Sequence, residues 1–179
     1  MGTYNFSDDW RSMSTFFTAD LHFGHGNIIK HCARPFKDAE EMDRELIKNW
    51  NSVVGAEDHV FILGDFSVKW KMTKERCEYL LHELRGLKHL ILGNHDITDP
   101  VFLTECGFYS VHYPALTVGD FICVHDPALS QVDNRSKKFL CGHVHNLFLQ
   151  QKNAFNVGVD MHNYTPVRLE EIQELWEDI

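Results

Sequence analysis

Five short apolar runs along this chain each end in residues that can bind a metal ion. The groups that follow the runs are, in chain order, Asp20-Leu21-His22, Gly64-Asp65, Gly93-Asn94-His95-Asp96, His125-Asp126 and Gly142-His143-Val144-His145. In open α/β sheets, functional sites lie outside the carboxyl ends of the strands. If each run is a strand, we expect these polar groups to meet at one rim of the fold.

Helical periodicity fills the gaps between the first three strands. We expect strands at 15–19, 60–63 and 89–92 and helices over Asp38–Val54 and Lys71–Arg85, with Gly86 as a helix stop. The apolar residues of the two helices fall at helical spacing: Met42, Leu46, Trp50 and Val53, then Cys77, Leu80, Leu81 and Leu84. This βαβαβ order predicts parallel pairing with right-handed crossovers.

The second half of the chain has a different pattern, in which strands predominate. Phe108–Val124 predicts two or three strands with a turn near Gly119-Asp120, and short strands are expected at 138–141 and 154–157 before a helix at Leu169–Trp176. A sandwich of two sheets flanked by helices accommodates both halves. The 179 residues suit a single domain, 1–179.

Composition excludes some classes of protein. The formal net charge is −9 without a basic stripe, which argues against stable nucleic-acid binding, although bound divalent metals would still let a phosphate approach. No apolar run is long enough to span a membrane. The five cysteines are odd in number, widely spaced and without a CxxC pair, which indicates reduced thiols in a cytoplasmic protein.

The strand-end residues share one chemistry, because carboxylate oxygen and imidazole nitrogen together suit Mn, Fe, Ni, Co or Zn. The natural ligands are Asp20, His22, Asp65, Asn94, His125, His143 and His145. Seven ligands are too many for one tetrahedral site and fit two ions that share a bridging carboxylate. Taken singly, Asp-x-His is uninformative and Gly-Asp is usually a turn. The ordered conjunction of five such blocks favours a metal site.

At these residues the sequence resembles the calcineurin-like metallophosphoesterase superfamily, whose blocks are Asp-x-His, Gly-Asp, Gly-Asn-His-Asp/Glu, a later His and Gly-His-x-His. All five are present in that order from Asp20 to His145. The flanking Arg34-Pro-Phe and Asn156-Val-Gly-Val-Asp resemble small stand-alone bacterial and phage members. The resemblance implies an α/β fold of two mixed sheets packed as a sandwich between helices, in four αββα layers.

The resemblance also assigns roles. Asp20, His22 and His145 look like ligands of a first metal, and Asn94, His125 and His143 like ligands of a second, with Asp65 bridging them. His95 resembles the family's catalytic histidine, which is not a ligand. Two divalent ions are implied, with manganese preferred. They would supply hydroxide that attacks phosphorus, while His95 assists the leaving oxygen.

Several neighbours of these blocks are candidates for further roles. His25 is expected to line the site and bind substrate, because Gly24 keeps it close to His22. Arg34 could clamp a phosphate or form a surface salt bridge, and both interpretations stay open. Asp96 is a weak candidate for orienting His95, and Asp126 is a partner of His125 or, slightly favoured, a turn residue.

The sequence therefore predicts an enzyme that hydrolyses a small phosphodiester or phosphomonoester, with the diester slightly favoured. Phe66-Ser67-Val68-Lys69-Trp70 replaces the Tyr-Val-Asp-Arg-Gly of many phosphoprotein phosphatases, which argues against protein phosphatase activity. The alternatives are a catalytically silent metal-binding scaffold, opposed by the complete set of ligands and His95, and a nuclease-type phosphodiesterase, opposed by the acidic charge. The sequence leaves the oligomeric state open.

Overall fold

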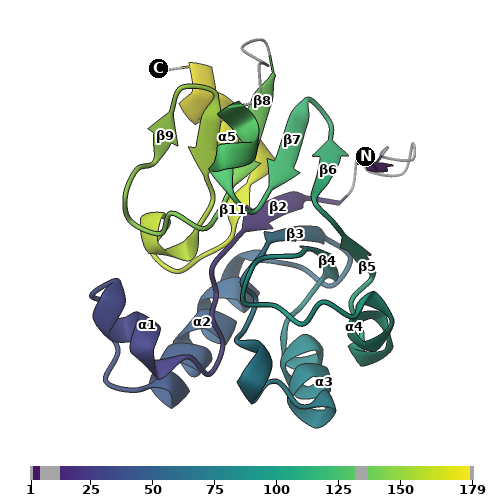
Figure 1. The fold of residues 1–179 in the computed structure, drawn as a ribbon, viewed down its shortest axis with the longest axis vertical. Helices are drawn as coiled ribbons and strands as arrows, with labels where there is room; N and C mark the ends of the chain where they lie inside the picture. Colours follow the sequence, from purple (N-terminus) through teal and green to yellow (C-terminus); the bar gives the residue numbers. More distant parts are fainter. Residues whose placement is uncertain (1, 5–12, 132–136, 178–179) are drawn as a thin grey trace.

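Two β-sheets pack face to face in the computed structural model, which describes residues 2–4, 13–131 and 137–177 (Figure 1). The five-stranded sheet has the order β11-β2-β3-β4-β5. Its strands are β2 (Thr15–Thr18), β3 (His59–Leu63), β4 (Leu87–Ile91), β5 (Ser110–His112) and β11 (Val167–Arg168). Strands β2 to β5 run parallel, as the βαβαβ order predicts, and β11 is antiparallel to β2.

The six-stranded sheet has the order β1-β6-β7-β8-β10-β9. Its strands are β1 (Gly2–Tyr4), β6 (Ala115–Val118), β7 (Phe121–Val124), β8 (Lys138–Cys141), β9 (Gln150–Gln151) and β10 (Ala154–Asn156). Strands β6 and β7 form an antiparallel hairpin around the predicted turn, whereas β7, β8 and β10 are parallel. Both sheets are mixed, so the predicted fold class is confirmed.

The main core lies between the two sheets. It takes alternate residues of the strands, so that one face of each sheet is buried against the other. Its large members are Phe17, Phe61, Leu63, Phe121, Leu140 and Phe155. Removing one such side chain from water contributes about 1.5–3 kcal/mol. The core therefore holds the carboxyl ends of β2, β3, β7 and β8 in fixed relative positions.

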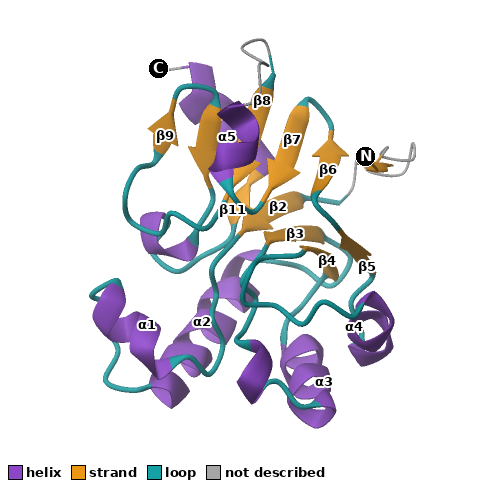
Figure 2. Cartoon of the chain, in the orientation of Figure 1, coloured by secondary structure: helices purple, strands orange, loops and turns teal. Residues whose placement is uncertain are grey.

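Four helices cover the outer face of the five-stranded sheet, and a fifth lies beside the other sheet (Figure 2). The four are α1 (Gly26–His31), α2 (Ala39–Val53), α3 (Lys74–Glu83) and α4 (Pro100–Cys106). Asp38 caps α2 by accepting the Glu41 N–H at 2.8 Å, and Thr73 caps α3 by accepting the Arg76 N–H at 3.2 Å. These caps place both helix starts inside the predicted ranges.

The predicted apolar faces of α2 and α3 are buried, except that Val53, at the end of α2, is 39% exposed. Helix α5 (Leu169–Glu177) inserts Ile172 between the sheets. All five cysteines are free thiols. Among the described residues, no helix has the length and apolar character that a membrane crossing requires.

Candidate metal centre

The loops after five strands meet at one rim of the sandwich. They follow β2, β3 and β4 of one sheet and β7 and β8 of the other. Backbone hydrogen bonds fix the loops to one another: the Asp20 N–H donates to the Gly64 carbonyl at 3.1 Å, and the His22 N–H to the Asp65 carbonyl at 2.9 Å. The expectation of a shared rim therefore holds for the backbone that carries the candidate ligands.

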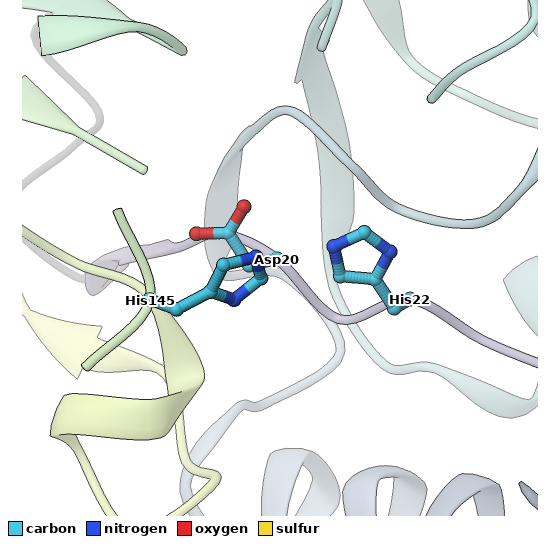
Figure 3. Close-up of side chains that lie close together, drawn as sticks. All are labelled: Asp20, His22 and His145. Carbon is cyan, nitrogen blue, oxygen red and sulfur yellow. The ribbon is translucent and has the colours of Figure 1, made fainter. Parts of the chain in front are cut away.

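One cluster at this rim joins Asp20 and His22, from the loop after β2, with His145, from the loop after β8 (Figure 3). Their ligand atoms lie within 4.8 Å of one another. Asp20 is fully buried, and both its carboxylate oxygens accept the backbone N–H of His143, at 3.0 and 2.9 Å. Burial raises the pKa of Asp20 to about 7. A cation beside it would favour the ionised form.

A second cluster contains Asp65, His125 and His143, whose ligand atoms also lie within 4.8 Å of one another. The ring of His125 is oriented by the Leu63 carbonyl, which lies 2.8 Å from Nδ1 and accepts its proton. Nε2 of His125 is therefore the nitrogen that faces the cluster, 3.0 Å from Oδ1 of Asn94. A backbone partner of this kind fixes the tautomer of a histidine ligand.

Asp65 belongs to the second cluster and also faces the first. Its Oδ2 is 3.4 Å from Nε2 of His22, and its Oδ1 is 3.5 Å from Nε2 of His125. Oδ1 also accepts the backbone N–H of His95 at 2.9 Å, and this bond fixes the orientation of the carboxylate. The two carboxylate oxygens of Asp65 therefore face histidines from both clusters.

The donor set fits divalent cations. Nε2 of His22 is buried and has no hydrogen-bond partner among the residues that the structure describes. A buried nitrogen without a partner is costly, and a bound cation would satisfy it. Burial also lowers the pKa of His22, so that the ring is neutral and able to bind a metal. Imidazole nitrogens combined with carboxylate and amide oxygens suit the borderline divalent metals.

Backbone strain is concentrated in the candidate ligands. Five of the seven have φ in the left-handed region, in which residues with a side chain are uncommon. They are Asp20 (58°), His22 (54°), Asp65 (54°), His143 (70°) and His145 (48°). Such conformations persist only where the surroundings impose them, and they cluster at functional sites.

Two glycines are required by the close approach of these loops. Gly64 has φ +85°, and a Cβ there would collide with the ring of His125. A Cβ on Gly93 would collide with Oδ1 of Asp65 and would lie 2.5 Å from the Asp65 nitrogen. Only a residue without a Cβ allows these two loops to approach the ligands so closely.

A cavity of about 440 Å³ opens beside the clusters. Its polar lining includes His22, His25, His95, His143 and His145, and its apolar lining includes Ile28, Val144 and Leu147. The ring centroid of His95 lies 5.3 Å from that of His22 and 6.0 Å from that of His25. His25 therefore lines the site, with its Nδ1 3.3 Å from Nδ1 of His22.

Sequence reasoning did not assign a place in the site to Trp70. Its side chain is 62% exposed, and its ring centroid lies 6.0 Å from that of His25 and 6.1 Å from that of His95. In the sequence, Trp70 stands out only as part of the segment that departs from the phosphoprotein phosphatase motif. Its position five residues after Asp65 gave no signal for a place beside the cavity.

Arg34 is neither a surface residue nor free to clamp a phosphate. Its side chain is fully buried and forms a bidentate ion pair with Asp160, with both N···O distances 2.8 Å. The remaining donors reach the Asp20 carbonyl at 2.7 Å, the Leu21 carbonyl at 3.2 Å and the Met42 sulfur at 3.4 Å. All five N–H donors of the guanidinium are thus used within the chain, which contradicts the interpretation as a substrate ligand.

Asp96 supports the loops rather than His95. Its carboxylate accepts the backbone N–H groups of Asp65 at 2.8 Å, Gly93 at 2.9 Å and Ser67 at 3.4 Å, and burial raises its pKa to about 7. Asp126 accepts the backbone N–H of Ala128 at 2.8 Å, a contact typical of a turn residue.

Comparison with known proteins agrees with the geometry. The sequence model of the calcineurin-like phosphoesterases matches residues 13–178. The chain belongs to the calcineurin-like phosphoesterase family. Membership of this family implies metal-dependent hydrolysis of phosphoesters, and the structure offers Asp/His clusters for the metal.

Several relatives of this calcineurin-like phosphoesterase are small proteins. An uncharacterized protein of Methanocaldococcus jannaschii is 36% identical over 170 residues, which cover 90% of each chain. The gene 66 protein of Mycobacterium phage L5 is 45% identical over 92 residues, 49% of this chain and 42% of that protein. The crystal structure of a protein of unknown function from Aquifex aeolicus shares the fold, with a TM-score of 0.70 and 23% identity over 91% of this chain and 99% of that one.

Proposed function

We propose that this protein is a dinuclear metal-dependent phosphoesterase that hydrolyses a small phosphodiester or phosphomonoester. Asp20, His22 and His145 would hold one divalent cation, Asn94, His125 and His143 would hold the other, and Asp65 would bridge them. The observation that carries the proposal is the Asp65 carboxylate, whose two oxygens lie 3.4 Å from His22 and 3.5 Å from His125. Manganese is the preferred metal, and Fe, Ni, Co or Zn also suit this donor set.

Two divalent cations, when bound, supply a hydroxide nucleophile at neutral pH and offset the charge that develops on the phosphate. The chain holds the remaining groups in place. The His95 N–H donates to Asp65, which anchors the His95 backbone while its ring reaches the cavity. There His95 would donate a proton or hydrogen bond to the leaving oxygen. His25 lines the same cavity and would contact the substrate.

We expect a small substrate, with a diester slightly preferred over a monoester. The cavity of about 440 Å³ combines histidines with the apolar side chains of Ile28, Val144 and Leu147. An ester with a small organic group would fit this lining. The net charge of −9 supports the absence of stable nucleic-acid binding, and a shared core between the sheets supports a single domain.

The test is hydrolysis of bis(p-nitrophenyl) phosphate and p-nitrophenyl phosphate by the purified protein with Mn²⁺. We expect turnover that EDTA abolishes and that added Mn²⁺ restores. If the protein binds two Mn²⁺ ions and hydrolyses neither these esters nor a panel of metabolite phosphoesters, the catalytically silent scaffold is the correct interpretation.

A further inference from the structure

A buried ion pair lies directly behind the cluster of Asp20, His22 and His145. It consists of Arg34, in the loop after α1, and Asp160, in the 3₁₀ turn Val159–Met161. The side chains are 0% and 3% exposed, respectively. Burying two charges carries a large desolvation cost, so such a pair is weak evidence of a role in stability alone. Its other contacts indicate a more specific role.

Both members of the pair also contact residues of the cluster. Oδ2 of Asp160 lies 3.0 Å from Nδ1 of His145. Arg34 donates to the backbone carbonyls of Asp20, at 2.7 Å, and of Leu21, at 3.2 Å. One ion pair therefore joins the loop after β2 to a histidine from the loop after β8.

We propose that Arg34 and Asp160 are positioning residues of the first metal subsite. Asp160 accepts the proton of His145 Nδ1, which leaves Nε2 unprotonated as the nitrogen that binds the cation. Arg34 holds Asp160 in the orientation for this bond and, through the Asp20 and Leu21 carbonyls, fixes the left-handed backbone of the Asp20–His22 segment. The inference rests on the proposed metal centre but not on ester hydrolysis.

The geometry makes arginine the suitable cation for this task. Its planar guanidinium binds both oxygens of Asp160 while its other N–H groups reach two carbonyls, a pattern that a lysine ammonium cannot reproduce. Carboxylate partners of histidine ligands fix the ring, and their loss weakens metal affinity by about 10- to 100-fold.

The test compares Asp160→Asn and Arg34→Lys with the wild type by calorimetric titration of Mn²⁺ into the metal-free full chain. We expect two sites in the wild type and, in each variant, one site weakened by about 10- to 100-fold while the other keeps its affinity. Lys88→Met is the matched control, because Lys88 donates to the Leu81 and Leu84 carbonyls at 2.9 and 2.8 Å at the opposite end of β4. It should lower the Tm and leave both Mn²⁺ affinities unchanged.

A second measurement needs no substitution. Long-range ¹H–¹⁵N correlations of the metal-free wild type, recorded at a pH at which the His145 ring is neutral, report which of its nitrogens carries the proton, and we expect Nδ1. A neutral ring protonated at Nε2, or two variants that bind both Mn²⁺ ions with wild-type affinity, would overturn the inference, as would a wild type that binds no Mn²⁺. Selective loss of one site in a protein that hydrolyses no ester would refute the proposed activity and leave the inference standing.

Discussion

Oδ2 of Asp65 lies 3.4 Å from Nε2 of His22, a buried nitrogen without a hydrogen-bond partner among the described residues. The second oxygen of the same carboxylate faces the other cluster. In the proposed dinuclear centre, the loss of Asp65 should therefore weaken metal binding at both subsites, whereas the loss of any other ligand should weaken binding at one.

We expect Asp65→Ala to lose both metal ions together, because in the proposed centre its carboxylate would supply an oxygen to each. Metal content per chain, measured by mass spectrometry after dialysis against Mn²⁺, checks this. Asp99→Ala is the control, since Asp99 only caps α4 through the Val101 and Phe102 N–H groups. It should reduce stability by about 0.5–2 kcal/mol and keep both ions. Retention of two ions by Asp65→Ala would contradict the bridging role.

His95→Asn should keep both metal ions and lower kcat by roughly 10²- to 10⁴-fold, the usual contribution of a general acid. The reason is that the His95 ring reaches the cavity without belonging to either ligand cluster. Steady-state kinetics on bis(p-nitrophenyl) phosphate, with metal content measured in parallel, provide the test. His82→Asn, at a side chain that is 88% exposed, should match the wild type. A loss of metal in His95→Asn would make His95 a ligand instead.

Gly93→Ala should weaken Mn²⁺ binding and turnover together, because the new Cβ would collide with Oδ1 of Asp65. The same substitution at Gly26 adds a Cβ whose nearest neighbour, the Cβ of Ala39, lies 4.0 Å away. Gly26→Ala should therefore be tolerated. Calorimetric titration and thermal melts of both variants separate the two cases. If both variants bind Mn²⁺ with the same affinity, the close approach of Gly93 to Asp65 is not needed for metal binding.

Stability in acid should depend on His89, which lies in the middle of β4 and is not a candidate ligand. His89 is buried, its ring stacks on Phe61 with centroids 4.5 Å apart, and burial lowers its pKa from 6.5 to about 3. Because the folded pKa is the lower one, its contribution to stability is complete above pH 6.5. That contribution is lost progressively as the pH falls from 6.5 towards 3.

His89→Gln should flatten the fall in the free energy of unfolding over this pH range. Urea denaturation in EDTA at several pH values measures the slope. His82→Gln, at an exposed position, should keep the wild-type slope. A His89→Gln variant with an unchanged slope would exclude His89 as a source of the acid sensitivity.

Periodicity predicted the elements that are long enough to have a period. The helix over Asp38–Val54 and the strand at 138–141 are found at α2 and β8. Helices α1 and α4, of six and seven residues, were not predicted, because so short a segment hardly completes two turns. The signals for α4 were nevertheless present: the Asp99 cap, Pro100 in the first turn and Gly107 at the end. The two-residue strands β9 and β11 carry no pattern of their own.

The candidate site was predictable where it depends on the order of strands. A polar residue directly after a buried strand must lie at the rim, wherever the intervening chain runs. The supporting contacts were not predictable in this way. Arg34 and Asp160 are 126 positions apart, and nothing local in either segment indicates that they pair. The role of Asp96 was missed for a related reason, because its partners include the backbone of Asp65, 31 residues away.

Each cluster draws on loops from both sheets: Asp20 and His22, after β2, meet His145, after β8, and Asp65, after β3, meets His125 and His143. A cation bound in either cluster would therefore connect the two sheets at the rim, where several loop residues have left-handed backbone conformations. Amide hydrogen exchange in these loops should then slow when metal is added, and chelation should let the rim open before the core between the sheets does. In this protein, the number of bound metal ions would then determine whether the two sheets stay closed at the rim.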